Sequence, residues 1–346
     1  MWKLDNKTAY AADSTWVRDA DGAEIWIVAV KATYALQADG SLRPATHQLP
    51  LNPGLVMHED GKSPLFETDL GPAKNATDIW LSGHAYSQNG QPLSRTRVAF
   101  AVGPVVRHLE VVGDRDGGLF SAEPRPFVRM PLLWSRAFGG GGAECASGNP
   151  AGCGLRAMPD GRQPLPNLLD PADPGSRTGH CFGPVPRHWP LRRQFAGTYD
   201  EHWQNTRAPL QAADLDPRHW QVAPLQQQVA GHLRGGEAIA LQGVTPPGFA
   251  PSGIVRCSLP KLTLGFQTRF LDGSSATSRS VIHNLILLPD GVDDSGPLIC
   301  VVHHMALPCH ARVNQLDCTI ISEKRRPLDL PGQASADQDT PEESLT

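Results

Sequence analysis

The 346-residue sequence has no hydrophobic run long enough to cross a membrane. Its longest uninterrupted aliphatic or aromatic segment is residues 25–30, whereas a membrane-spanning helix needs about 20 apolar residues. Residues 1–6 contain no apolar core of the kind that a secretory signal carries. We therefore expect a cytoplasmic protein that does not insert into membranes.

The sequence also lacks an excess of positive charge and an even set of cysteines. Lysine and arginine total 31 against 35 acidic residues, so the net charge is −4, whereas nucleic-acid-binding domains carry a basic patch or stripe. The 7 cysteines are scattered along the chain, which favours reduced thiols over a disulfide framework. We therefore expect no nucleic-acid partner and no disulfide-stabilised, secreted fold.

Amphipathic helical patterns are scarce, whereas strand-like runs rich in β-branched and aromatic residues are frequent. Two groups of strands are predicted, at residues 15–18, 24–34, 78–86, 96–102 and 105–112, and at residues 235–241, 254–259, 262–270, 280–288 and 298–302. Turn-forming pairs such as Asn89-Gly90 separate them, and the close spacing favours antiparallel pairing. The prediction is a mostly-β protein with few short helices, its body an antiparallel β-sandwich or barrel-like structure.

A segment rich in glycine and proline separates the two groups of strands. Residues 131–200 contain 12 glycines and 10 prolines, a level that is usual in low-complexity segments. Large apolar residues such as Trp134, Phe182 and Trp189 punctuate it, and burying them would offset the entropy lost on ordering a loop. We therefore expect a long, Gly/Pro-rich but ordered loop layer packed on the β body.

These patterns divide the chain into four parts. Residues 1–125 form the predicted N-terminal antiparallel part, 126–231 the loop layer and 232–326 the C-terminal β part. Past Arg326 the sequence has five acidic residues and no basic one, so residues 327–346 are predicted to be a disordered tail.

A metal site is weakly indicated. His303, His304, Cys309 and His310 lie close together in sequence, and Cys145, Cys153, His180 and Cys181 fall in the glycine-rich segment. Zinc ligands typically come as two tight pairs, and the sequence has no second pair at such spacing. We predict no metal and no cofactor, but the sequence does not decide whether the cluster at 303–310 binds a metal.

Catalytic signatures are equally sparse. The sequence has no Gly-x-Ser-x-Gly elbow, and the glycine run at 139–142 lacks the Gly-Lys-Ser/Thr that completes a phosphate-binding loop. Asp200 could form the acid pair of a carbohydrate-active hydrolase with Asp214, Asp216 or Glu237. The simpler interpretation is that Asp200 binds its own turn and Asp214 caps a short helix. No catalytic residue is predicted.

Binding of another protein is the remaining hypothesis. Arginine and large aromatic residues are common anchors of protein interfaces, and the loop layer supplies both. The candidate contact residues are Arg136, Phe138, Tyr199, Asp200, Trp203 and Arg207. The alternative for each aromatic ring is that it fastens the layer to its own sheet.

Several motifs in colinear order support this hypothesis. They include residues 1–8, 16–19, 22–26, 28–33 and 78–86, Arg-Ala-Phe-Gly-Gly at 136–140, Asn-Pro at 149–150, Leu-Pro-Asn-Leu at 165–168, Gly-Thr-Tyr-Asp at 197–200 and Gly-Gly-Glu at 235–237. Over roughly residues 1–325 the sequence resembles the bacterial domain-of-unknown-function family 2169. The motif positions that the resemblance marks are Gly139, Gly140, Asn149, Pro150, Asn167, Gly197, Gly235, Gly236 and Glu237.

The resemblance implies an accessory role in type VI secretion. Members of the family act as cytosolic adaptors or chaperones that help load a toxic effector onto the spike, which comprises the valine-glycine-repeat protein VgrG and its PAAR-type cap. They are not established enzymes, and no catalytic residues transfer. We therefore expect a non-enzymatic adaptor whose partners are a secreted effector and spike proteins. A structural part of the secreted needle, which would form a stable symmetric oligomer, is a further alternative.

Overall fold

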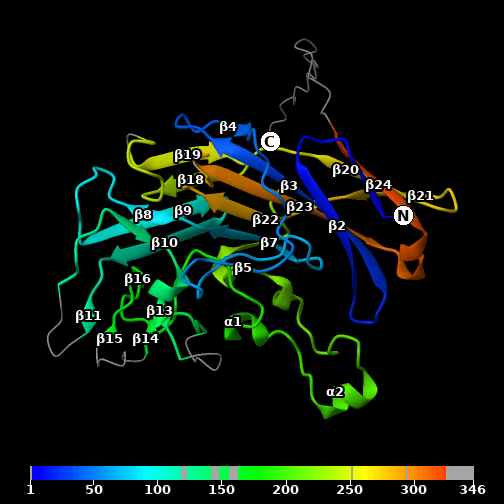
Figure 1. Cartoon of the computed structure of the whole chain (residues 1–346), viewed down its shortest axis with the longest axis horizontal. Helices are drawn as coiled ribbons and strands as arrows, with labels where there is room; N and C mark the ends of the chain where they lie inside the picture. Colours follow the sequence, from blue (N-terminus) through cyan, green and yellow to red (C-terminus); the bar gives the residue numbers. More distant parts are fainter. Residues whose placement is uncertain are drawn as a thin grey trace, which may run out of the picture.

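A computed structural model describes residues 2–117, 123–141, 148–155, 163–250, 252–293 and 295–324. Figure 1 shows a body built of β-strands, with an arm around α2 (Glu201–Thr206) projecting from it. The mostly-β fold predicted from the sequence is confirmed. The tail predicted at residues 327–346 lies outside the described residues.

The largest sheet runs through the middle of the body and takes strands from both ends of the chain (Figure 1). Its order is β17 (Gln228–Ala230), β7 (Ala76–Leu81), β22 (Val281–Leu288), β23 (Leu298–Pro308), β3 (Glu24–Leu36) and β2 (Ala11–Arg18), with β4 (Leu42–Pro44) paired to β3. Most residues of β3, β7 and β23 are buried. Strands covered on both faces are hydrophobic throughout, which explains the unbroken apolar run at 25–30.

Two smaller sheets cover one face of the central sheet. Alternate residues of β3 point to this face. Trp26 and Val28 pack in a cluster with Phe266 of the first sheet, whereas Tyr34 packs in a second cluster with Phe100 of the other sheet. The first sheet has the order β1 (Lys3–Asn6), β24 (Leu316–Glu323), β20 (Leu264–Phe270) and β21 (Ser275–Arg279). The second has the order β16 (Leu168–Leu169), β10 (Val105–Val112), β9 (Arg95–Val102), β18 (Ala238–Gln242) and β19 (Ile254–Ser258).

Irregular chain covers the opposite face of the central sheet. Ala29 of β3 and Trp80 of β7 are fully buried there, in a cluster with Val222 and with Leu49 and Phe66 from the proline-rich segment that precedes β7. The face of a strand alternates with each residue, so Ala29 and Val28 contribute to different layers. The body is therefore a sandwich with two sheets on one side of the central sheet and loops on the other.

The strands predicted from local patterns are present, with one difference in pairing. Residues 78–86 divide into β7 and β8 (His84–Tyr86). β22 pairs in parallel with β7, where antiparallel pairing was expected. β1 and β24, which the local patterns did not predict, also pair in parallel. Each of these two pairs joins strands from opposite ends of the chain, so no short turn fixes their direction.

The remaining elements are short. The two-stranded pairs are β5 (Val56–Met57) with β6 (Pro64–Phe66), β8 with β12 (Arg129–Pro131), β11 (Asp116–Gly117) with β15 (Gln163–Pro164), and β13 (Phe138–Gly139) with β14 (Cys153–Gly154). The helical elements are η1 (Trp134–Arg136), α1 (Pro190–Arg193), α2, η2 (Pro217–Trp220), η3 (Leu225–Gln227) and η4 (His310–Gln315). In the described parts of the chain, no helix has the length and apolarity needed to span a membrane.

Aromatic rings fix the loop layer to the sheets. Trp134 and Trp189 meet edge to face with ring centroids 5.6 Å apart, and Phe182 meets Phe100 of β9 in the same way at 4.9 Å. Each of these side chains is at least 97% buried. Such pairs add stability beyond the burial of area alone, so the described part of the glycine- and proline-rich segment is held in a defined conformation.

A network of buried charges also joins the layer to the central sheet. Asp78 of β7 is fully buried and accepts hydrogen bonds from Lys74 Nζ at 2.6 Å, Val222 N at 2.7 Å and Ala223 N at 3.1 Å. Lys74 Nζ also donates to Asn284 Oδ1 on β22 at 2.6 Å. A single carboxylate therefore connects two strands of the sheet to the segment that follows η2.

Two further buried ion pairs extend this network. Lys31 of β3 lies 2.8 Å from Asp69, and Arg192 of α1 lies 2.9 Å from Glu67. Arg192 also donates to Val185 O at 2.6 Å. The sequence pattern did not identify these residues, because the partners come from segments far apart in the chain.

Removing the Asp78 carboxylate should destabilise the whole fold. Asp78→Ala leaves Lys74 without its ion pair and two backbone N–H groups without acceptors, so the free energy of unfolding should fall by about 3–5 kcal/mol. Asp5→Ala, which breaks the exposed pair with Lys7, should cost less than about 1 kcal/mol. Denaturant unfolding of both variants measures the difference, and equal effects would contradict a structural role for Asp78.

Three histidines stack in the same region of the core. The ring centroids of His283 on β22 and His304 on β23 lie 3.7 Å apart, and the ring centroid of His232 lies 6.0 Å from that of His283. His304 Nε2 donates to Gly71 O at 2.9 Å. Burial lowers the pKa of His304 to about 4 and holds the pKa of His283 well below its usual range. Both side chains are therefore neutral at neutral pH.

Acidification should weaken the fold through these histidines. The unfolded chain, with histidine pKa values of about 6.5, binds protons that the folded chain excludes, so unfolding free energy should fall between about pH 6.5 and pH 4. The slope is at most about 1.4 kcal/mol per pH unit for each histidine. His304→Gln retains a donor for Gly71 and should show a shallower fall in denaturant unfolding, whereas the exposed His47→Gln should match wild type. Equal slopes for His304→Gln and wild type would refute this assignment.

Candidate functional site

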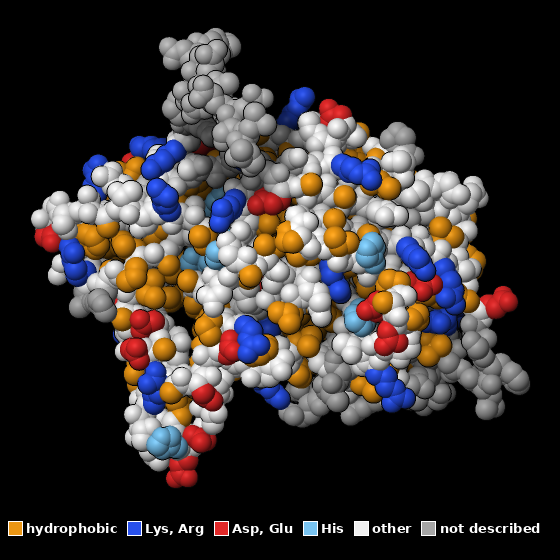
Figure 2. All heavy atoms as spheres, turned by 180° about the vertical axis from the view of Figure 1, so that it is seen from behind, with side chains coloured by type: hydrophobic (Ala, Val, Ile, Leu, Met, Phe, Trp, Pro, Cys, Tyr) orange, Lys and Arg blue, Asp and Glu red, His pale blue; other side chains and the backbone are white. Residues whose placement is uncertain are grey.

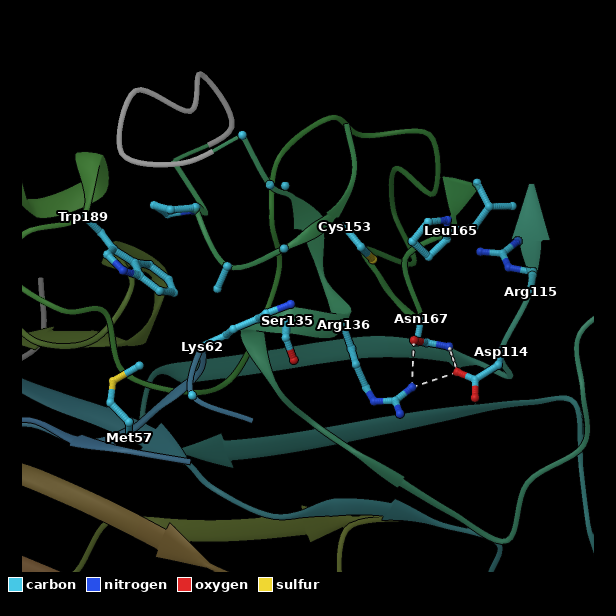
Figure 3. A pocket seen from close by; sticks show the side chains of 18 of the residues that line it. Met57, Lys62, Asp114, Arg115, Ser135, Arg136, Cys153, Leu165, Asn167 and Trp189 are labelled. Atoms are coloured by element: carbon cyan, nitrogen blue, oxygen red, sulfur yellow. Dashed lines mark hydrogen bonds and ion pairs between the residues drawn. The ribbon is translucent and has the colours of Figure 1, made fainter. Parts of the chain in front are cut away.

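The largest concentration of the motif residues surrounds an open basin of about 860 Å³ in the loop layer (Figure 3). Its rim and floor come from η1, the β13–β14 pair, the end of β10 and the loop before β6. We call this hollow the basin; its lining residues are Met57, Gly61, Lys62, Asp114, Arg115, Arg125, Ser135, Arg136, Gly139, Gly140, Gly141, Pro150, Ala151, Gly152, Cys153, Pro164, Leu165, Asn167, His188 and Trp189.

Asn149 lies behind the lining of the basin and holds together the segments that form it. Its side chain is buried, and Nδ2 donates to Trp134 O at 2.9 Å and to Phe138 O at 3.1 Å. Its backbone oxygen accepts from Gly140 N at 2.9 Å. A Cβ on Gly139 would overlap the backbone oxygen of Asn149, so the close approach of these segments requires glycine there. The Phe138–Gly140 and Asn149–Pro150 motifs are therefore parts of one structural unit.

Asn167 fixes the cationic side of the basin. Arg136 Nη1 donates to Asp114 Oδ1 at 2.8 Å and to Asn167 Oδ1 at 3.1 Å, as the dashed lines in Figure 3 show. Asn167 Nδ2 donates to the same Asp114 oxygen at 3.0 Å and to Val112 O at 2.9 Å. Because Asn167 N also donates to Arg136 O at 2.8 Å, the guanidinium is held in one orientation.

The lining of the basin is positively charged although the whole chain is acidic. Four basic side chains, those of Lys62, Arg115, Arg125 and Arg136, face one carboxylate, that of Asp114. A concave surface lined by one sign of charge focuses the electrostatic potential and attracts ligands of opposite charge. The basin is therefore suited to an acidic ligand.

The potential nucleophiles of the basin are engaged in structural contacts. Ser135 donates its hydroxyl to Asp60 Oδ2 at 2.8 Å, and its backbone N–H binds Ser63 Oγ at 3.0 Å. Burial raises the pKa of the Cys153 thiol, which favours the less reactive protonated form. The Ser135 hydroxyl is therefore engaged with Asp60, and burial favours the protonated form of the Cys153 thiol.

Four of the predicted contact residues lie elsewhere, in the projecting arm at residues 196–216 (Figure 1). Asp200 caps α2 by accepting from Trp203 N at 2.9 Å, and Tyr199 meets Trp203 edge to face at 4.8 Å. Arg207 Nη2 donates to Ala20 O at 2.6 Å in the β2–β3 turn. The structure therefore divides the predicted contact residues between the basin, near Arg136 and Phe138, and the arm.

Three motif glycines and one motif acid lie outside the basin, in structural turns. Gly197, at φ 82°, closes the base of the arm, where a Cβ would come within 2.8 Å of Ala212 Cβ. Gly236 N donates to Leu259 O at 2.7 Å beside Gly235, and Leu259 N donates to Glu237 O at 2.9 Å. These positions shape turns at the arm and before β18, away from the basin.

The carboxylates considered for hydrolysis are engaged in structural hydrogen bonds. The prediction that Asp214 caps a short helix is wrong, because Asp214 accepts from Thr198 and Asp216 caps η2. Asp200 and Asp214 line one hollow of about 360 Å³ in the arm. Hydrogen bonds from the backbone and side chain of Thr198 lower the pKa of Asp214, and those from Arg218 lower the pKa of Asp216. Glu237 Oε1 accepts from Arg234 N at 2.7 Å. A glycosidase acid needs a raised pKa, so the two shifts run opposite to that requirement.

The residues considered as metal ligands are dispersed or engaged with backbone. His304 binds Gly71 O, and Cys309 Sγ donates to Glu24 O at 3.5 Å. Cys181 Sγ donates to Leu132 O at 3.4 Å, and Cys153 lines the basin. Cys145 and the side chain of His310 lie outside the described residues. Among the described residues, no three His, Cys, Asp or Glu side chains are placed to share a metal.

Most of the charged residues of the basin carry no local sequence pattern that marks them as part of a site. Lys62 lies in the proline-rich segment before β7, and Asp114 and Arg115 follow β10 without a recognisable pattern. Asn167 was marked by its motif, but the motif did not show that its amide orients Arg136. Charges on irregular chain carry no periodic signal, and the fold alone brings them together.

The Asn149 side chain provides a test of how the basin is built. In Asn149→Asp, carboxylate oxygens would face the carbonyl oxygens of Trp134 and Phe138, so this variant should be destabilised more than Asn149→Ala, which should lose about 1–3 kcal/mol of unfolding free energy. Asn89→Asp is the matched control, because exposed Asn89 Oδ1 accepts from Ser87 Oγ and Gln91 N. It should change stability by less than about 0.5 kcal/mol. Denaturant unfolding compares the three, and a milder effect of Asn149→Asp than of Asn149→Ala would contradict this geometry.

Comparison with known proteins identifies the family of the chain. No curated protein and no solved structure matches it. A family model described as "Uncharacterized protein conserved in bacteria (DUF2169)" matches residues 21–292. The matched range contains the central strands β3, β7 and β22, the basin and the arm. The chain therefore belongs to this bacterial family, domain-of-unknown-function family 2169.

Proposed function

We propose that the chain is a cytosolic adaptor of type VI secretion, which binds a secreted effector and helps load it onto the VgrG/PAAR spike. The observation that carries the proposal is the basin: a rigid, cationic concavity built from the motif residues of an acidic protein. The chain holds its partner by surface contacts and releases it during assembly, without covalent chemistry.

The rigidity of the basin supports a binding role. Asn149 and Asn167 hold the floor and Arg136 before any partner arrives, through the hydrogen bonds at 2.8–3.1 Å described above. A preformed surface loses little conformational entropy on binding. Arg136 can offer its remaining guanidinium edges to a carboxylate, and arginine is among the most frequent anchors of protein interfaces. The basin therefore fits an acidic segment of a partner.

The arm gives the molecule a second surface with different chemistry. Figure 2 shows acidic side chains around the tip of this projection, on the lower left of the view. Its acidic residues include Asp200, Glu201 and Asp214, and Tyr199 is 51% exposed beside them. An adaptor must contact two partners, and surfaces of opposite charge can select two different ones.

The secretion context of the proposal comes from the family resemblance of the sequence. Binding fits the geometry better than hydrolysis, because hydrogen bonds from Thr198 and Arg218 stabilise Asp214 and Asp216 as carboxylates. Recovery of partner proteins from the bacterium that produces the chain is the experiment that separates partner binding from hydrolysis.

Basin charge should be required for partner recovery. When the tagged full chain is isolated from cells that express the secretion system, an effector or a spike protein should copurify. Lys62→Glu combined with Arg125→Glu should reduce recovery at least about tenfold, because it reverses two charges in the basin. Raising the salt concentration should also reduce the partner recovered with wild type, because salt screens the charges of the basin.

The matched control reverses the same number of charges outside the basin. Arg43 of β4 and Arg269 of β20 are exposed, so Arg43→Glu with Arg269→Glu should leave recovery unchanged. Quantitative mass spectrometry of the isolated complexes measures how much partner protein is recovered with wild type and with each of the two double variants. Absence of any effector or spike protein with wild type would overturn the adaptor proposal, and equal recovery with both double variants would exclude the basin as the contact surface.

A further inference from the structure

A second cavity in the loop layer is smaller and more enclosed than the basin. It has a volume of about 260 Å³ and lies between β10, the segment before α1 and the segment around η3. Trp134 lines this cavity, whereas its edge-to-face partner Trp189 lines the basin. We call it the Arg107 cavity, after the β10 residue on its wall.

The Arg107 side chain has unused binding capacity. It makes no hydrogen bond or ion pair with the part of the chain that the structure describes, and its Nε is buried without a partner. Burial lowers the pKa of Arg107, and Asp170 offsets that effect only from a distance. A guanidinium has five N–H donors in a planar fork that matches a carboxylate. A carboxylate in the cavity would supply the missing acceptors.

Two more residues that line the cavity each carry a buried polar atom without a partner among the described residues. Gln221 is 3% exposed, and its Oε1 has no hydrogen-bond donor. His180 Nε2 is likewise unpaired, while its Nδ1 lies 3.9 Å from Asp170. Buried polar atoms without partners are rare and costly. The Gln221 oxygen requires a donor, which a carboxylate alone does not provide.

Apolar side chains and arginines make up much of the rest of the wall, together with the neutral polar residues Thr178, Gln194, Gln226 and Gln228. Val185, Leu191 and Phe195 line it together with Trp134, and three arginines, Arg107, Arg192 and Arg218, contribute to it. Arg192 and Arg218 have carboxylate partners, Glu67 and Asp216, but no acidic residue lines the cavity itself. Such a wall accepts an apolar group bearing a negative charge and disfavours a free ammonium group.

We infer that the Arg107 cavity binds the C-terminal residue of a partner polypeptide. The terminal carboxylate pairs with Arg107, the amide N–H of the same residue donates to Gln221, and an apolar side chain occupies the space beside Trp134 and Phe195. Sites for drug-sized molecules measure about 300–1,000 Å³, so the cavity suits a single residue. A free amino acid would bring an ammonium group among the arginines, whereas a peptide bond removes it.

This inference rests on the proposed function, because it names the part of a partner that the adaptor recognises. The probe is a blocked peptide of four alanines followed by a C-terminal leucine, titrated into the full chain and followed by calorimetry. The free-acid peptide should bind at least about tenfold more tightly than its C-terminal amide, which lacks the charge that Arg107 pairs with. Equal affinity for acid and amide would overturn the inference.

Small acids provide the second arm of the test. Free leucine should bind at least tenfold more weakly than the peptide, because its ammonium group meets the arginines. N-acetyl-leucine keeps the carboxylate, N–H and side chain that make the three proposed contacts, so its affinity should lie within about tenfold of that of the peptide. If N-acetyl-leucine fails to bind while the peptide binds, the contacts lie outside the terminal residue and the assignment of the cavity is wrong.

Variants separate this site from the basin. Arg107→Gln should weaken peptide binding at least about tenfold, whereas Arg97→Gln, on the neighbouring strand β9 and exposed, should not. Thermal unfolding of both variants tests folding, and unchanged peptide affinity in folded Arg107→Gln would overturn the site. If effector or spike proteins copurify but no peptide binds, the inference fails and the adaptor proposal stands. If the peptide binds and no partner is recovered, the adaptor proposal fails instead.

Discussion

The structure depends on one buried carboxylate, that of Asp78. A charged group without water is stable only when its partners are complete, and two of the partners of Asp78 are backbone N–H groups of the loop layer, at Val222 and Ala223. The third is Lys74, which also binds Asn284 on the neighbouring strand. The sheet therefore reaches its stable state only when the layer is docked, so that ordering of the layer is coupled to folding of the body.

This coupling explains how so much irregular chain can form a fixed binding surface. Glycine and proline give the layer little intrinsic structure, so aromatic pairs and buried polar contacts hold it at separate points. Between those points the layer does not close completely over the sheets. The basin, which is open and cationic, and the Arg107 cavity, which is more enclosed, both border the Trp134–Trp189 pair.

Local patterns in the sequence predicted most of the fold, and long-range contacts account for what they missed. β10 coincides with its predicted range because alternation and the flanking turns determine it locally. The parallel pairing of β1 with β24 depends on residues more than 300 positions apart, for example Lys3 and Cys318. The same limit applies to the site: motifs marked Asn149 and Asn167, but which backbone oxygens their amides bind is decided by the tertiary structure.

The charge of the basin also constrains how a partner could leave. Arg136 is already bound to Asp114 and Asn167, so a ligand carboxylate adds to an existing network and does not complete an unpaired ion. Exposed charge pairs are screened by salt and individually weak, which favours a moderate affinity that a competing acidic surface can displace. In the proposed adaptor role, capture by a preformed cationic surface and release by competition would both depend on the same fixed guanidinium. A transient carrier requires this combination, whereas a permanent subunit would be expected to bury a larger and more hydrophobic interface.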